Sequence, residues 1–207
     1  MIATILPGSA DFHAVGYNEH KVYKGVATLL EMRNFGGLDA SEHPTAKQLV
    51  QFLQFYSSQN SRIQKPQFHV AISCKGHEMS EQQLLDFAHR YLQEMGYAEP
   101  GHPWLIYAHH DTDNTHLHIV TSRVSPDGRK IQHDHERRRS QTVIDKILGM
   151  DRQQKTDKDI EAAKQYSFSS FAQFKAVMGT MGYEVFQKDG NVFVKQGGRI
   201  QKKLPLT

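Results

Sequence analysis

The chain has 207 residues, of which 38% are hydrophobic, and this length is enough to bury one sizeable core, so we expect one compact domain. A formal charge of +3 is compatible with a nucleic-acid partner, while the single cysteine, Cys74, excludes an internal disulfide and a cysteine-rich zinc ribbon. The sequence contains neither a signal peptide nor an apolar run near the roughly 18 residues of a membrane span, which predicts a cytoplasmic protein without membrane insertion.

The first half of the chain contains alternating strand and helix patterns. Apolar residues at spacings of three and four predict helices, and β-branched runs bounded by turn residues predict strands. The last helix of this half has the clearest limits, because Ser80 and Gln83 form a capping-box pair and Gly96 provides a stop. We expect strands at residues 2–6 and 67–73, and helices from about 14 to 30, from 45 to 58 and from 80 to 95.

The second half of the chain begins with two β-prone runs, at 104–109 and 115–124, joined by a short polar link. A turn then leads to a short strand at 130–132, and the charged composition of residues 132–166 predicts a mobile segment. Residues 167–207 are expected to add a helix and a hairpin that complete a single domain spanning 1–207. The predicted fold class is α+β, a central antiparallel sheet with helices packed outside.

Histidines are concentrated in the segment HHDTDNTHLHIV. His116 and His118 lie two residues apart in a predicted strand, so both imidazoles should point to the same face of the sheet. The hairpin brings the end of the preceding strand beside them, where His109 or His110 can supply a third ligand, since neighbours on a strand face opposite ways. Three imidazoles leave coordination positions open, which predicts a catalytic metal site, with Asp111 as an acceptor for a ligand histidine.

The string HHDTDNTHLHIVTSRV resembles the third motif of mobilization relaxases. Its histidine, the aspartate two positions on and the His-x-His pair fit His109, Asp111, His116 and His118. The segments GYNEHKVYKG, ATLLEMRNF, FHVAIS, EMGY and MGYEV also resemble HUH-type, MobA/MobL-like relaxases of Bacteroides-type mobilizable elements or plasmids. This resemblance covers nearly the whole chain and implies the HUH relaxase fold, with the histidines on central strands.

The resemblance also implies a chemistry. In that family a tyrosine near the N-terminus attacks DNA, and the matching residue is Tyr17, with Tyr23 as the second candidate. The implied product is a reversible 5′-phosphotyrosyl DNA, formed at an origin of transfer with a divalent metal ion (Mn, Mg, Zn, Ni or Co) to begin conjugative mobilization.

The expected partners are single-stranded or hairpin origin-of-transfer DNA, accessory mobilization proteins and a coupling protein. Basic side chains in one region of the chain are candidates for contacts to the DNA backbone. They are Arg123, Arg129, Lys130, Arg137, Arg138 and Arg139.

Two other enzyme classes are alternatives. A rolling-circle replication initiator would use a tyrosine after the histidine pair, either Tyr166 or Tyr183. A metal-dependent phosphoesterase would attack with a metal-bound water and form no covalent intermediate. A third alternative is a DNA-binding module that has no catalytic activity.

Overall fold

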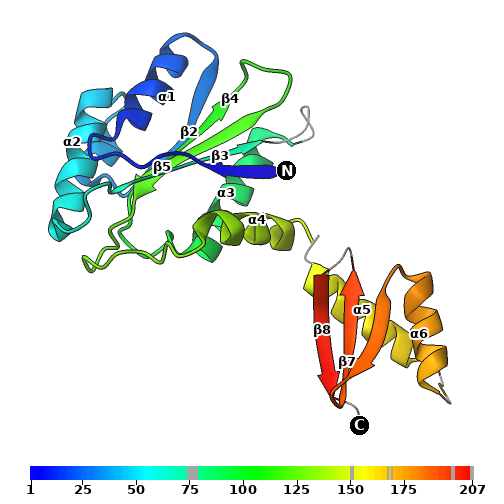
Figure 1. Cartoon of the computed structure of the whole chain (residues 1–207). Coiled ribbons are helices and arrows are strands. Elements are labelled where there is room, and N and C mark those ends of the chain that lie inside the picture. The colour runs from blue at the N-terminus through cyan, green and yellow to red at the C-terminus, as the bar shows by residue number, and fades with distance from the viewer. Residues whose placement is uncertain (74–78, 150–151, 167, 169, 197–198, 206–207) are drawn as a thin grey trace. The chain divides into compact units, whose positions relative to one another are not determined.

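The computed structural model describes residues 1–73, 79–149, 152–166, 168, 170–196 and 199–205. The chain forms two compact units, Met1–Ile144 and Asp145–Thr207 (Figure 1). The amino-acid sequence predicts a single domain over the same length. That the second unit completes the domain formed by the first stays a prediction.

The first unit is built on a five-stranded sheet in which every neighbouring pair is antiparallel. Its strand order is β1-β3-β5-β4-β2, so β5 is the central strand and β3 and β4 flank it. The strands are β1 (Ile2–Ile5), β2 (Ala27–Arg33), β3 (Gln67–Ser73), β4 (Trp104–His109) and β5 (His116–Ser122). The helices lie outside this sheet, which confirms the predicted α+β class.

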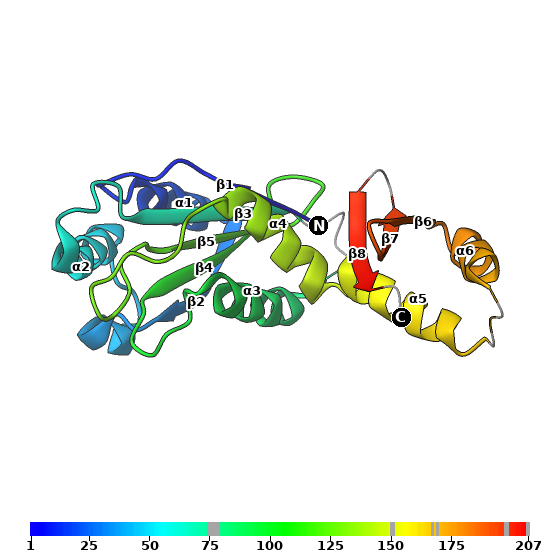
Figure 2. The ribbon, with the colours of Figure 1, turned by 60° about the horizontal axis from the view of Figure 1, so that its bottom comes forward.

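Helices cover both faces of the sheet (Figure 2). On one face, α1 (His13–Tyr23) and α2 (Ala46–Ser57) enclose a core that includes Phe12, Leu53 and Tyr107. Helix α3 (Glu81–Met95) contacts β2, β4 and β5 with the buried side that includes Leu84 and Leu92. These buried apolar faces hold β4 and β5 between two layers of helix.

Two of the predicted helices begin at capping boxes. Thr45 caps α2 with Gln48, and Ser80 caps α3 with Gln83, each side chain accepting from the N3 backbone. Gly96 ends α3 with a φ of 85°, a left-handed conformation that glycine adopts without steric cost. The predicted limits of α3 are confirmed.

The predicted helix at about 14–30 is wrong beyond Tyr23. Helix α1 ends there, Gly25 takes a φ of 70°, and the chain enters β2. The sequence of β2, ATLLEMR, consists largely of good helix formers, so local propensity favours the wrong structure. Pairing along β4 overrides this propensity, as is common for strands whose neighbours are distant in sequence.

Two helices, α4 (Glu136–Ile147) and α5 (Arg152–Lys164), occupy most of the charged segment from 132 to 166. The mobility predicted for that segment stays a prediction. Before α4, the strand expected at 130–132 is reduced to a single bridge between Val124 and Lys130.

The second unit contains a three-stranded antiparallel sheet with two helices. The sheet is β6 (Glu184–Lys188), β7 (Asn191–Gln196) and β8 (Arg199–Pro205), and α5 and α6 (Phe171–Thr180) pack against it. Asp189 and Gly190 both have positive φ, as a tight hairpin turn requires, which confirms the predicted turn.

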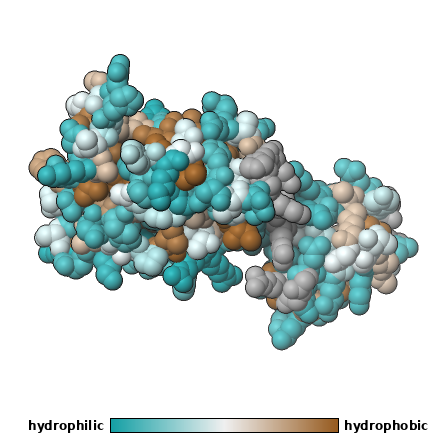
Figure 3. Space-filling view, turned by 90° about the horizontal axis from the view of Figure 1, so that it is seen from above, coloured by the Kyte–Doolittle hydropathy of each residue, from teal (hydrophilic) through white to brown (hydrophobic). Residues whose placement is uncertain are grey.

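Hydrophilic residues predominate on the face of the molecule drawn in Figure 3, where hydrophobic residues form small patches. Within the described part of the chain, no helix combines the length and the apolar character needed to cross a membrane.

Candidate functional site

Three histidines share one face of the sheet at the end of β4 and the start of β5. The register pairs His109 with His116, and Tyr107 with His118, so the side chains of each pair point the same way. The two-residue period of β5 places His116 and His118 on that same face. Because β5 is the central strand, the cluster lies on the middle of this sheet face rather than at an edge, and α1 covers it.

The imidazoles form a packed cluster. The rings of His109 and His118 stack with their centroids 4.0 Å apart, and both side chains are buried. Nε2 of His69, on β3, lies 2.9 Å from Nδ1 of His118, which adds a fourth ring. His116 is half-buried, and its Nδ1 lies 3.1 Å from the hydroxyl of Thr112.

Helix α1 places Tyr17 against this cluster. Its ring centroid lies 6.0 Å from that of His109 and 6.3 Å from that of His118. The side chain is 49% exposed, so a ligand can reach it from solvent. Tyr17 therefore combines proximity to the histidines with access to a macromolecular substrate.

The next residue on α1, Asn18, holds His109 in place. Its Oδ1 lies 2.7 Å from Nε2 of His109, while its own Nδ2 donates to the carbonyl of Ala14. Since the amide nitrogen is the donor to Ala14, Oδ1 accepts, and Nε2 of His109 carries the proton. Nδ1 is then the nitrogen of His109 with a free lone pair.

A lysine one turn after Tyr17 brings a positive charge to the site. Nζ of Lys21 lies 5.0 Å from the centroid of the Tyr17 ring and 2.5 Å from Oδ2 of Asp111. Burial opposes the charged form, but hydrogen bonds with Asp111 and Tyr17 hold the pKa of Lys21 above its ordinary value. Asp111 thus contacts Lys21, and its predicted role toward a ligand histidine stays a prediction.

The buried histidines His109, His118 and His69 are neutral near pH 7. Burial lowers the pKa of His109 to about 4, with a smaller contribution from the charge of Lys21. Burial and the neighbouring His109 lower the pKa of His118 to about 2, and burial lowers that of His69 to about 4. Neutral imidazole is the form that binds metal ions, so the donors fit a divalent cation in their chemistry.

The side chains do not form a ready metal site in this arrangement. Among the residues that the structure describes, no three His, Cys, Asp or Glu side chains are grouped to hold an ion. Nε2 of His109 is hydrogen-bonded to Asn18, and Nδ1 of His118 is hydrogen-bonded to His69. To coordinate a metal ion, each of these two rings must use its other nitrogen, or its present hydrogen bond must break.

His110 points away from the cluster. Its Nε2 lies 3.4 Å from Oε1 of Glu81, at the first turn of α3, on the opposite side of the sheet from α1. Of the two alternatives for a third histidine, the structure brings only His109 to the face shared by His116 and His118.

The other candidate tyrosines occupy different environments. Tyr23, the last residue of α1, is 89% exposed and lies six positions beyond Tyr17. Tyr166 and Tyr183 belong to the second unit. Tyr183 is buried there and donates its hydroxyl to Asp159, whereas Tyr166 is exposed.

The basic candidates differ in accessibility. Arg123 is buried and forms a double ion pair with Glu136, at 2.5 and 2.8 Å, so its guanidinium is engaged inside the fold. Arg129 pairs with Asp127 at the surface. Arg137 and Arg138 are exposed on α4, while Arg139 is half-buried and donates to the carbonyl of Gln132.

Lys130 lines a cleft of about 460 Å³ that is mainly basic. Arg62 and Lys65, both exposed, share this cleft with His133, and the Arg123–Glu136 pair forms part of its wall. Arg62 and Lys65 could not be linked to Lys130 from the amino-acid sequence, because they are 65 or more residues from it along the chain. The cleft provides several cations for phosphate groups.

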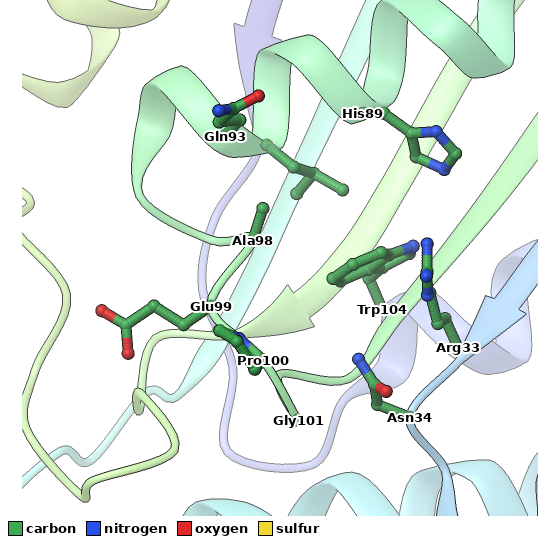
Figure 4. A pocket seen from close by; sticks show the side chains of 10 residues that line it. Arg33, Asn34, His89, Gln93, Ala98, Glu99, Pro100, Gly101 and Trp104 are labelled. Carbon is green, nitrogen blue, oxygen red and sulfur yellow. The ribbon is translucent and has the colours of Figure 1, made fainter.

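A larger pocket of about 590 Å³ lies at the other end of β4 (Figure 4). Trp104, the first residue of β4, lines it together with Arg33 and His89. Because His109 is the last residue of the same strand, this pocket is separate from the histidine cluster.

One more polar residue near the site, Glu19, was not expected from the sequence. Glu19 accepts a hydrogen bond of 2.7 Å from the hydroxyl of Tyr107, which lies on the same face as His118. Burial raises the pKa of Glu19, although the bond from Tyr107 opposes this. With Asn18 and Lys21, Glu19 is a third polar residue that α1 contributes near the histidines.

A family model described as Relaxase: MobA/VirD2-like, nuclease domain, matches residues 17–149. The matched segment begins at Tyr17 and includes β4, β5 and all the cluster histidines. No curated protein and no solved structure matches the chain.

Proposed function

Because the chain belongs to the MobA/VirD2-like relaxases, which nick DNA in mobilization, we propose that it cuts one strand at an origin of transfer with Tyr17 as the nucleophile. The observation that carries this proposal is the position of Tyr17, 6.0 and 6.3 Å from the rings of His109 and His118 and open to solvent. Among the candidate tyrosines of the first unit, Tyr17 is the one in contact with this cluster.

In the proposed reaction, the Tyr17 oxygen attacks the phosphorus of one phosphodiester. The Tyr17 hydroxyl loses its proton to solvent as its oxygen forms a bond to phosphorus. The bond from phosphorus to the 3′ oxygen breaks, and that oxygen takes up a proton from solvent to become a 3′-hydroxyl. The product is a 5′-phosphotyrosyl DNA. Because the adduct is itself a phosphodiester, the 3′-hydroxyl can attack its phosphorus, release Tyr17 and restore the strand.

Lys21 is placed to assist this step. Its ammonium group lies beside the Tyr17 ring, and the salt bridge to Asp111 fixes it there. A positive charge near the phenol oxygen favours loss of the proton and stabilises the negative charge that develops.

We propose that His109, His116 and His118 hold a divalent ion, which when bound supplies a Lewis acid for the scissile phosphate. The support is the shared sheet face, the neutral state of the buried imidazoles, and the general metal dependence of relaxases. Three histidines suit Mn, Zn, Ni or Co, while Mg is a candidate through its abundance.

The substrate is single-stranded or hairpin DNA of the origin of transfer. The cleft lined by Arg62, Lys65 and Lys130, together with the exposed Arg137 and Arg138, provides cations for the DNA backbone. The nicked strand would then enter conjugative mobilization, with accessory mobilization proteins and a coupling protein as partners.

The test is adduct formation on single-stranded oligonucleotides tiled from the DNA next to the gene, in Mn²⁺ or Mg²⁺. We expect an SDS-resistant adduct that mass spectrometry locates on Tyr17, and that is lost with EDTA and in Tyr17→Phe. Tyr23→Phe is the matched control on the same helix and should form the adduct normally.

The other results of this experiment identify the alternatives. An adduct on Tyr166 or Tyr183 would indicate the arrangement of a rolling-circle initiator. Cleavage without an adduct would indicate a phosphoesterase, and tight binding without cleavage would indicate a DNA-binding module. For the metal, His109→Ala should abolish ion binding and cleavage, whereas His110→Ala should preserve both.

A further inference from the structure

The sheet of the second unit carries aromatic and basic side chains on one face. The register pairs Phe186 with Phe193, and Phe193 with Lys203, so these three side chains point the same way. The two phenyl rings stack with centroids 5.4 Å apart, and Nζ of Lys203 lies 5.8 Å from the centroid of Phe193. We call this the Phe186 face.

The helices of the unit cover the opposite face. Val185, Val192 and Val194 alternate with the two phenylalanines and are buried in the core that α5 and α6 complete. Lys202 follows the same alternation, because it pairs with Asp157 of α5 at 2.8 Å while its neighbour Lys203 is exposed. Because α5 and α6 pack on the side of these valines, the Phe186 face points away from both helices.

More apolar and basic groups lie on this face. Ile200 pairs with Lys195 in the register and is 55% exposed. Lys188, in line with Phe186 on β6, is exposed, and Lys195 makes a 3.0 Å ion pair with Glu184. The face thus combines three apolar side chains with three lysines and one acidic group.

Charge is distributed unevenly between the two units. Residues 145–207 contain eleven Lys and Arg and seven Asp and Glu, a net charge of +4. Residues 1–144 contain fourteen and fifteen, a net charge of −1. The positive charge of the whole chain therefore comes from the second unit, which favours a polyanionic ligand there.

We infer that the Phe186 face binds single-stranded DNA. Aromatic side chains on an open sheet stack with unpaired bases whatever their sequence, while lysines around them neutralise the phosphates. Double-stranded DNA fits this surface less well, because its bases are already stacked inside the helix.

Such a surface meets a need of strand transfer. This inference rests on the proposed function only in taking the nicked single strand as the ligand. The 5′ end of that strand is held covalently by the enzyme, but the 3′ end is held only by non-covalent contacts. Rejoining requires the 3′ end to stay bound to the protein. A second DNA-binding surface on the same chain raises the effective concentration of that end near the covalent adduct.

The test measures binding of the full chain to a fluorescent oligothymidylate of about 20 nucleotides, which is longer than the site of one such surface. EDTA is present, so that metal and cleavage do not contribute. We expect Phe186→Leu/Phe193→Leu to raise Kd by between about fivefold and a hundredfold. Phe55→Leu, at a phenylalanine of α2 that is 78% exposed, is the matched control and should leave Kd unchanged.

A second variant, Lys188→Gln/Lys203→Gln, changes only exposed side chains and should fold normally. It should reduce the slope of log K against log salt by about 1.4, since each phosphate contact on a single strand contributes roughly 0.7. Wild-type Kd in the folded phenylalanine variant, or a wild-type salt slope in the lysine variant, would overturn the inference, as would a preference for RNA. If the wild-type chain bound oligothymidylate as expected but formed no adduct on Tyr17, that result would instead count against the proposed nucleophile.

Discussion

Asn18 accepts a hydrogen bond of 2.7 Å from Nε2 of His109, across 91 residues of sequence. This contact joins α1, which carries Tyr17, to β4, which carries one of the proposed metal ligands. The orientation of the His109 ring and the position of the helix are therefore linked by one side chain.

Asn18→Ala should impair both the site and the fold. A buried N–H of His109 loses its acceptor, which costs about 1–3 kcal/mol of stability. Loss of a partner that orients a metal ligand typically lowers activity by about 10- to 100-fold, and we expect that effect on the rate of adduct formation. Asn18→Asp keeps an acceptor oxygen and should recover part of the rate. Wild-type kinetics in Asn18→Ala would show that the contact has no role in the reaction.

Lys21→Met should slow adduct formation by roughly ten- to a hundredfold, because a charge near the attacking oxygen is lost. Single-turnover kinetics with saturating oligonucleotide separates this effect from weaker binding. The control is Lys24→Met, which removes an exposed lysine just after the same helix and should leave the rate unchanged. Equal rates in the two variants would mean that Lys21 only ties α1 to Asp111.

The histidine face was predictable because it depends on local rules. A two-residue period sets the direction of His116 and His118, and a short hairpin brings the end of the neighbouring strand beside them. Spacing left His109 and His110 as alternatives, and the strand register then places His109 opposite His116. Asn18 and Lys21 were not predictable in this way. Their roles depend on how α1 packs over β4 and β5, and no local pattern near residue 18 specifies a contact 91 residues away.

The elements of the fold also differ in whether local sequence or tertiary packing determines them. The capping pair of Ser80 and Gln83 and the turn at Asp189–Gly190 are encoded within a few residues, and both were predicted. Strand β2 was missed because its residues prefer a helix, and only the tertiary pairing with β4 makes it a strand. The division into two units was also not expected, since the length of the chain suits one domain.

Arg123→Met should destabilise the first unit by about 3–5 kcal/mol, because it leaves the partly buried Glu136 without its partner. Urea denaturation measures this change. Arg129→Met removes an exposed ion pair with Asp127 and should cost less than about 1 kcal/mol. If Arg123→Met lowered DNA affinity without any loss of stability, Arg123 would act as a phosphate contact, as the amino-acid sequence alone suggested.

The stability of the protein should fall in acid partly through His102, which lies just before β4, at the opposite end of that strand from His109. The hydroxyl of Thr121 donates to the carbonyl of Pro103 and so accepts from Nε2 of His102, 2.7 Å away. Nδ1 then accepts from Tyr56 at 3.2 Å, so both nitrogens are satisfied only in the neutral ring. Burial lowers the pKa of His102 from 6.5 to about 4.

The unfolded chain therefore binds a proton at His102 more readily than the folded chain does. The stabilising contribution of the neutral ring is complete above pH 6.5 and is lost as the pH falls toward about 4. Buried histidines of the cluster add to the same trend, so the measurement is a difference between wild type and His102→Gln. Urea denaturation at pH 7.5, 6, 5 and roughly 4 should show a shallower decline in the variant. Parallel curves for the two proteins would mean that protonation of His102 does not oppose folding.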